Sequence, residues 1–317
     1  MMVATLVAIS FVSFAIIQLP PGDFLTTMQA EQAVSGGGLS QEMIQFLRER
    51  YGLNEPFMTQ YLRWIAGFPK GDFGYSFEWN VPVWALIGDR MAYTLLLGAL
   101  SLIVMFALSI PIGIYSSTHQ YSFADAALST LSFLGLSIPG FLLALVWMYV
   151  GGLVLRIPVG GVLSDSLVDQ PMSITKLLDY LNHLWPPALI LGLASTGQLT
   201  RIMRSGMLDV LSQQFITTAR AKGLPEKRVI NKYAVRTALN PIVSVLAMEI
   251  PKIISASILI GVVMSVPTTG PLFLRSLLSQ DMYLAGTFLL MMAVMQLVAN
   301  LLADIALAWL DPRIVYT

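Results

Sequence analysis

The residues that could carry chemistry are few and far apart. The 317-residue chain has no cysteine, and its two histidines, His119 and His183, stand alone in the sequence. A bound zinc or nickel ion needs about four ligands, so we expect no intrinsic metal site and interpret both histidines as solvated loop residues. No G-x-x-x-x-G-K-[ST] segment occurs, which excludes a phosphate-binding loop of that type. No nucleophile–base arrangement supports an enzyme.

Glu249 and Lys252 are charged residues inside an otherwise apolar stretch. Residues three apart share one face of a helix, so the two side chains could pair. A charge at the centre of a bilayer costs about 2.5–3.5 kcal/mol on insertion scales, which makes such residues candidates for function. Two interpretations stay open: a polar wall of a translocation path, or a structural ion pair that faces another helix.

A polar stripe lies in the last apolar stretch, where Gln296, Asn300 and Asp304 recur every four residues. We expect Asn300 and Asp304 to serve packing or hydrogen bonds between subunits. The same stretch carries Met291, Met292 and Met295, which could offer an adaptable surface to varied ligands or simply pack against other helices. Gln296 and Met292 therefore join Glu249 and Lys252 as candidate path residues.

The composition predicts the elements that hold these residues. Hydrophobic residues make up 56% of the chain, charged residues 11%, and the mean hydropathy is +0.73. This excludes a disordered chain and argues against a soluble domain, so we expect an all-α polytopic membrane protein. A membrane helix needs about 20 apolar residues. Six stretches qualify, the third long enough to tilt or to break at Pro139-Gly140: 1–19, 92–115, 127–155, 185–204, 238–264 and 284–310.

Two of the predicted segments allow alternatives. Stretch 1–19 lacks a basic leader and a small-residue cleavage site, which favours an uncleaved anchor over a signal peptide. An upstream start would supply the missing basic residues. Segment 20–91 has a flexible break at residues 36–38. It also predicts two amphipathic helices. The apolar face of the first, from Ser40 to Gly52, is Met43, Ile44, Leu47 and Tyr51, and that of the second, after Pro56, is Phe57, Tyr61, Leu62 and Ile65. We expect a small cap, a docking surface for an external partner, or both.

The cations are concentrated in one loop. Eight of the 18 Lys and Arg lie between residues 201 and 236: Arg201, Arg204, Arg220, Lys222, Lys227, Arg228, Lys232 and Arg236. The positive-inside rule therefore predicts that loop 201–240 is cytoplasmic, with both termini on the same side and segments 20–91 and 156–184 outside. The cations of this loop could bind acidic residues of another surface, or the loop could simply lie near anionic lipid.

The same loop predicts two short helices that meet at an elbow. Phe215, Thr218, Ala219 and Lys222 fit one helical series. Gly223 is expected to end this helix and Pro225 to open the next. The small residues Ala219 and Ala221 would allow another surface to approach closely.

Here the chain resembles a family. Thr218 to Val229 reads TARAKGLPEKRV, which is similar to the cytoplasmic loop of ABC importer permeases, in particular the oligopeptide, dipeptide and nickel branch. Further segments are similar to the same family and occur in the family's order along the chain. They are Pro21-Gly22-Asp23, Tyr51 to Pro56, Gly71 to Ser76, Ser137 to Phe141, Asn300 to Asp304, and Leu310-Asp311-Pro312-Arg313.

The resemblance implies a type I ABC importer permease fold with six transmembrane helices. Residues 1–19 would form the first span, 20–91 a helical periplasmic insertion, and 92–317 a five-helix core. Residues 212–223 would form a coupling helix that docks on an ATP-binding subunit. The expected contacts are Thr217, which replaces the acidic residue of the general motif, and Thr218, Ala219, Arg220, Ala221, Lys222, Gly223 and Leu224.

The resemblance also implies the function and partners. The chain would be a non-enzymatic permease subunit in the bacterial inner membrane. It would work with a second homologous permease, two ATP-binding subunits and a soluble binding protein, and would bind no nucleic acid. ATP and Mg²⁺ would bind the partner subunits, and this chain would hold no cofactor. Peptide is the expected cargo, with nickel chelates and oligosaccharides as alternatives. Two other classes stay open: a stand-alone secondary transporter, and a membrane scaffold or enzyme.

Overall fold

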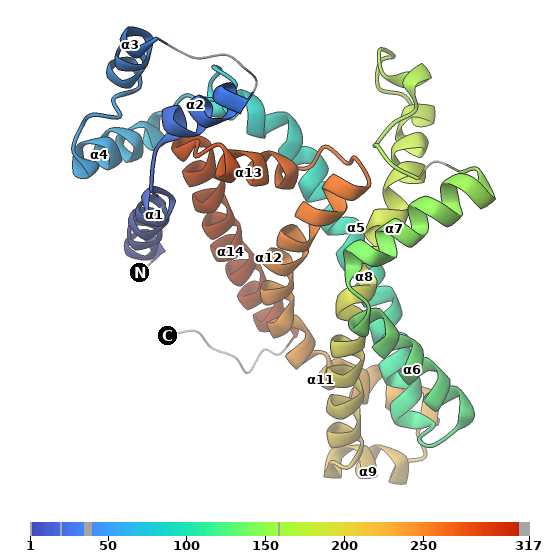
Figure 1. The fold of residues 1–317 in the computed structure, drawn as a ribbon. Coiled ribbons are helices and arrows are strands. Elements are labelled where there is room, and N and C mark those ends of the chain that lie inside the picture. The colour runs from blue at the N-terminus through green and yellow to red at the C-terminus, as the bar shows by residue number, and fades with distance from the viewer. Residues whose placement is uncertain (1, 20, 35–39, 158, 311–317) are drawn as a thin grey trace. The chain divides into compact units, whose positions relative to one another are not determined.

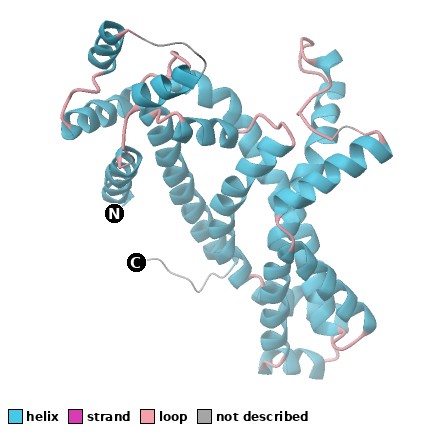
Figure 2. Ribbon diagram, viewed as in Figure 1, coloured by secondary structure: helices cyan, strands magenta, loops and turns pink. Residues whose placement is uncertain are grey.

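The structure is a computed structural model that describes residues 2–19, 21–34, 40–157 and 159–310 (Figure 1). Helices dominate these residues, no strand occurs among them, and one β-bridge joins Tyr75 to Pro82 (Figure 2). The all-helical prediction is therefore confirmed. The expected break at residues 36–38 and the Asp311-Pro312-Arg313 motif lie outside the described residues.

The chain divides into two compact units. The first contains residues 1–93 and 268–297, and the second contains 94–267 and 298–317. Helices α5 (Val83–Thr118) and α14 (Met282–Leu310) each contribute to both units. The predicted insertion 20–91 thus belongs to a larger unit that also includes residues far along the chain. Its bounds as a separate domain stay a prediction.

The first unit collects short helices around an aromatic core. It holds α1 (Met2–Gln18), α2 (Phe24–Val34), α3 (Gln41–Tyr51), α4 (Phe57–Gly67), the 3-10 turn η1 (Phe68–Lys70) and α13 (Thr269–Leu278). The Ser40 hydroxyl accepts a hydrogen bond from the Met43 amide at the start of α3, and Gly52 ends that helix at φ +67°. Both helix termini agree with the sequence prediction, because Ser and Gly are the preferred residues at those positions.

The faces of α3 and α4 were predicted only in part. In α4, Tyr61 and Trp64 are buried, and the Trp64 ring stacks on Phe14 of α1 at 5.3 Å between centroids. Met43 and Leu62, expected on the apolar faces, are exposed instead. The other predicted positions face inward: Ile44 is buried, and Leu47, Tyr51, Phe57 and Ile65 pack against the aromatic cluster.

The second unit is built around the long helix α8 (Ile174–Leu211). Helix α6 packs closely on it, since a Cβ atom at Gly135 would lie 2.8 Å from the Leu193 carbonyl oxygen, and one at Gly197 would lie 2.6 Å from that of Ser132. The other elements follow in order: α6 (Phe123–Ser137), α7 (Gly140–Tyr149), the π-helix η2 (Val150–Leu155), the 3-10 turn η3 (Asp165–Leu167), α9 (Gln214–Ala221), α10 (Glu226–Arg228), the π-helix η4 (Val229–Ala234), α11 (Val235–Ala238) and α12 (Asn240–Val263).

Length and apolar composition identify fewer spans than six among the described residues. Val83–Thr118 and Met282–Trp309 qualify alone, and two bent helix pairs raise the number to four if each pair is one span. One pair, Phe123–Ser137 with Gly140–Leu155, bends by 97°, which confirms the predicted break at Pro139-Gly140. The other pair lies within α12 and bends by 43°. Helix α1 is a shorter apolar helix, so the six-span count stays a prediction.

Candidate functional site

The 201–240 loop forms the predicted elbow. Helix α9 ends at Ala221, and Gly223 has a φ of +72°, a left-handed conformation that glycine adopts without strain. The Gly223 amide donates to the Arg220 carbonyl oxygen at 2.9 Å, and Pro225 precedes α10. The two helix boundaries that the sequence predicts are therefore confirmed.

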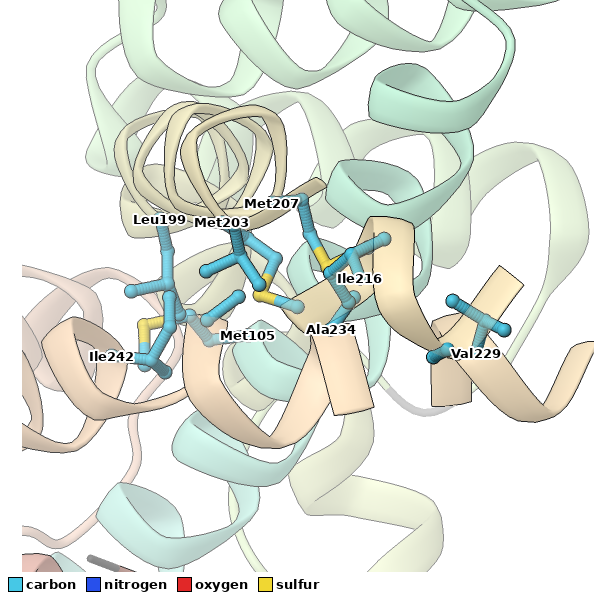
Figure 3. Packing of buried hydrophobic residues seen from close by; sticks show 11 residues of the cluster. Met105, Leu199, Met203, Met207, Ile216, Val229, Ala234 and Ile242 are labelled. Carbon is cyan, nitrogen blue, oxygen red and sulfur yellow. The ribbon is translucent and has the colours of Figure 1, made fainter. Parts of the chain in front are cut away.

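The inner face of α9 packs against other helices of the second unit. Ile216 is completely buried and Ala219 is 6% exposed. Figure 3 shows Ile216 beside Met203 and Met207 of α8 and Ala234 of η4, all members of one apolar cluster. The predicted approach of another surface to Ala219 is therefore wrong in detail, because this chain's own core already covers that side chain.

The outer face of α9 carries the other candidate contact residues. Phe215 is 43% exposed, although the sequence grouped it with Ala219 on one face. Leu224 is half-buried against the apolar cluster. The remaining predicted contacts are exposed: Thr217, Thr218, Arg220, Ala221, Lys222 and Gly223. The arrangement leaves a short helix with a fixed inner face and an outer face free to meet a partner.

An ion pair bridges the elbow. Arg220 donates two hydrogen bonds to Glu226, from Nη2 to Oε1 at 2.7 Å and from Nε to Oε2 at 3.1 Å. This two-point contact gives the pair a defined geometry. The Arg220 hydrogen bonds lower the pKa of Glu226, and the same contact raises the pKa of Arg220. Both side chains are exposed, so water screens their attraction.

Two cations of this loop contact helix α6 of the second unit. Arg204 donates to the buried Asp125 of α6 at 2.9 Å, and the Arg201 guanidinium lies 5.0 Å from the centre of the Phe133 ring. The sequence analysis counted these arginines only as markers of orientation. No sequence signal revealed their partners, because α7, η2, η3 and their connecting segments lie between α6 and α8 in the chain.

Glu249 and Lys252 pair as predicted. The Lys252 ammonium donates to Oε1 of Glu249 at 2.7 Å. The Glu249 side chain is 3% exposed and that of Lys252 is 50% exposed. The second carboxylate oxygen of Glu249, Oε2, is buried and has no hydrogen-bond partner among the described residues.

The candidate residues of α14 fall in both units. Met292 and Gln296 are half-buried in the first unit. Asn300 and Asp304 are exposed in the second, where the neighbouring Ala299 and Ala303 are buried beside Ile250. Met291 packs on the cluster around Val83 and Leu272, which supports the packing interpretation for that methionine.

The two histidines differ. His119 is exposed and stacks on Tyr115, as expected for a solvated residue. His183 is 6% exposed within α8, and its Nδ1 lies 2.9 Å from the Asp179 carbonyl oxygen, so the prediction of a solvated loop is wrong there. The described residues hold no cluster of three possible metal ligands.

Asp281 is a buried polar centre that the sequence analysis missed. It is completely buried just before α14, and its Oδ2 accepts hydrogen bonds from the Ser76 hydroxyl at 2.5 Å and from the amides of Phe77 and Glu78 at 2.9 and 3.3 Å. Oδ1 accepts from the Leu284 amide at 3.3 Å. Burial raises the pKa of Asp281, although these four donors act in the opposite direction. The carboxyl ties residues 76–78 to the start of α14.

Comparison with known proteins supplies a family. Residues 109–316 match the family described as "Binding-protein-dependent transport system inner membrane component", and residues 1–98 match "Binding-prot-dependent transport system membrane comp, N-term". The chain is 37% identical over 318 residues to the oligopeptide transport system permease protein AppB of Bacillus subtilis, across 100% of this chain and 97% of that protein. It is 30% identical over 330 residues to the dipeptide transport system permease protein DppB of Escherichia coli K12, across 99% of this chain and 96% of that protein.

Proposed function

Because the chain belongs to the inner-membrane components of binding-protein-dependent transport systems, we propose that it is a permease subunit of an ATP-driven importer of peptides. The printed functions of its relatives, oligopeptide and dipeptide transport, support the choice of cargo. The permease itself hydrolyses nothing. A second, similar permease completes the path, two ATP-binding subunits hold ATP and Mg²⁺, and a soluble binding protein delivers the peptide.

In this proposal the six spans are α1, α5, the bent pair of α6 with α7 and η2, α8, α12 and α14. The concentration of cations between residues 201 and 236 supports a cytoplasmic position for that loop and, with six spans, for both termini. Segments 20–91 and 156–184 then face outward, toward the binding protein. The family description, "inner membrane component", and the bacterial relatives support a location in the inner membrane of a bacterium.

The observation that carries the proposal is the two-faced helix α9. Its outer face, with Phe215, Thr218 and Lys222, is exposed and docks on an ATP-binding subunit. Its inner face, with Ile216 and Ala219, is buried in the cluster that includes residues of α8 and α12 (Figure 3). A displacement of α9 therefore moves those two helices, and alternating access follows from that movement. In this proposal Lys252 lines the path with Glu249 buried behind it, and Met292 and Gln296 remain candidate path residues.

The test uses two glycines in matched backbone conformations. Gly223 at the elbow and Gly161 in the outer loop have φ values of +72° and +73°, and a Cβ atom at either would meet nothing within 4 Å. A valine is strained by about 1–2 kcal/mol in this conformation. We expect Gly223→Val to reduce peptide uptake and binding-protein-stimulated ATP hydrolysis by about tenfold, while Gly161→Val leaves both near the wild-type level.

The measurement is made on the complete complex in proteoliposomes, after each variant is shown to insert and assemble. Wild-type transport by the Gly223→Val complex would contradict the coupling role of the elbow. Uptake by this chain alone without ATP would identify a secondary transporter instead.

A further inference from the structure

One face of α12 differs from the lipid-facing side of an ordinary membrane helix. Successive exposed positions along this face are Ser244, Met248, Lys252, Ser255 and Leu259. The opposite side is buried in the second unit, with Ile253 and Ile260 in its apolar cluster. Three of the five exposed positions are polar, and one carries a full charge. Such a face fits contact with water or a polar ligand better than contact with acyl chains.

Within the ion pair the two residues have different roles. Glu249 is buried on the inner side and reaches Lys252 through a single oxygen, while Lys252 is half-exposed. An ammonium donates up to three hydrogen bonds, and Glu249 is the one acceptor for Lys252 among the described residues. Glu249 therefore positions the ammonium, and Lys252 keeps donors for a further acceptor on the exposed face.

An exposed ammonium within an apolar span selects anions. A ligand carboxylate is the acceptor that suits it best, because hydrogen bonds between two ionised groups are shorter and stronger than neutral ones. Ser255, one turn of helix away, and Ser244, two turns away, keep the same face polar; the Ser244 hydroxyl itself donates to the Asn240 carbonyl oxygen at 3.4 Å. The face offers no exposed carboxylate that would repel such a ligand.

We propose that Lys252, held in position by Glu249, is a subsite on α12 for a carboxylate of the peptide cargo. This inference rests on the proposed function, because it names a contact within the same path. The carboxylate is either the free C-terminus of the peptide or an acidic side chain. The subsite helps to move zwitterionic peptides past the middle of the span.

The experiment compares uptake of three peptides by the complete complex in proteoliposomes with saturating binding protein. The first is a neutral tripeptide with a free C-terminus, the second is its C-terminal amide, and the third is an amidated tripeptide with one glutamate. The double variant Glu249→Gln/Lys252→Met removes both charges together, which avoids a buried carboxylate without a partner. Lys252→Arg keeps the cation, and Lys70→Met removes an exposed lysine elsewhere.

The readout is the ratio of uptake rates for each acidic peptide over the neutral amide. Each variant is compared with the wild type, so selection by the binding protein cancels. We expect the double variant to lower the ratio by about tenfold, the scale of one lost charge-assisted hydrogen bond. Lys252→Arg and Lys70→Met should keep the wild-type ratio. A fall for the free C-terminus alone, or for the glutamate peptide alone, identifies which carboxylate the subsite binds.

An unchanged ratio in the double variant overturns this inference and leaves the proposed function intact. A wild-type complex that imports none of the three peptides with ATP contradicts the proposed function itself. If the double variant does not assemble, Lys252→Gln decides, because its amide can still donate to Glu249 but has no charge. A wild-type ratio in Lys252→Gln would then overturn the subsite.

Discussion

Asp281 and Glu226 are two carboxylates that stabilise local structure in opposite environments, the first buried and the second exposed. Asp281 is completely buried and holds residues 76–78, about two hundred positions earlier in the sequence, through three hydrogen bonds, while a fourth joins it to the Leu284 amide. Glu226 is exposed and holds Arg220, six residues away, across the elbow of the 201–240 loop. Burial raises the pKa of Asp281, whereas the Arg220 hydrogen bonds lower the pKa of Glu226.

This difference in burial distinguishes Asp281, which forms a permanent junction, from the Arg220–Glu226 pair at the elbow, which can break and form again. Water has no access to replace the Asp281 carboxylate as an acceptor, so losing that carboxyl leaves buried donors without partners. Water and a docking protein can both compete for Arg220 and Glu226, because half of each side chain is accessible. The first unit is therefore fixed internally at Asp281, while the elbow is suited to a surface that a partner engages and releases.

The largest effect is expected for Asp281→Ala. The Ser76 hydroxyl and the amides of Phe77 and Glu78 would lose their acceptor, which costs about 3 kcal/mol or more when several buried donors are affected. The thermal unfolding temperature of the purified protein in detergent should fall clearly. Asp72→Ala is the matched control, since Asp72 is exposed and accepts one amide hydrogen bond, from Gly74. Equal stability of the two variants would contradict the assignment of Asp281 as a permanent junction.

The sequence could predict the elbow but not the junction. Gly223 and Pro225 are local signals, and the left-handed φ of that glycine is decided within a few residues. The break before Pro139 was predictable for the same reason. The contacts of Asp281 depend on the pairing of residues 76–78 with the start of α14, which no local pattern encodes.

The buried face of α9 could be predicted only in part from the sequence. Phe215 and Ile216 are adjacent apolar residues, and helical periodicity alone does not decide which one is buried. The choice depends on the positions of Met203 and Met207 on α8, so the buried residue is Ile216. The family, by contrast, could be recognised from the sequence, since short motifs occur in order along most of the chain and the family match covers the same residues.

A smaller effect is expected when the elbow pair is broken. Arg220→Glu places two carboxylates opposite each other, and the double variant Arg220→Glu/Glu226→Arg restores opposite charges. An exposed pair is worth about 0.2–1 kcal/mol, so the unfolding temperature should change little in either variant. Coupled ATP hydrolysis should fall about fivefold in the single variant, as expected for roughly 1 kcal/mol, and recover in the double variant. A double variant as defective as the single one would show that Arg220 acts through the partner and not through Glu226.

The smallest expected effect is in the pH dependence of stability, where the two carboxylates should have opposite signs. The lowered pKa of Glu226 means that its contribution is present above the ordinary value of 4.5 and is lost as the pH falls through the lower folded value. The raised pKa of Asp281 means that the folded state binds its proton more tightly, so stability increases as the pH falls through the raised value toward 3.8. Thermal unfolding from pH 7 to about pH 3 should therefore show Glu226→Gln losing its disadvantage against the wild type below 4.5, while Asp281→Asn becomes more disadvantaged as the pH falls. Parallel curves for the two variants would mean that burial does not distinguish the two carboxylates.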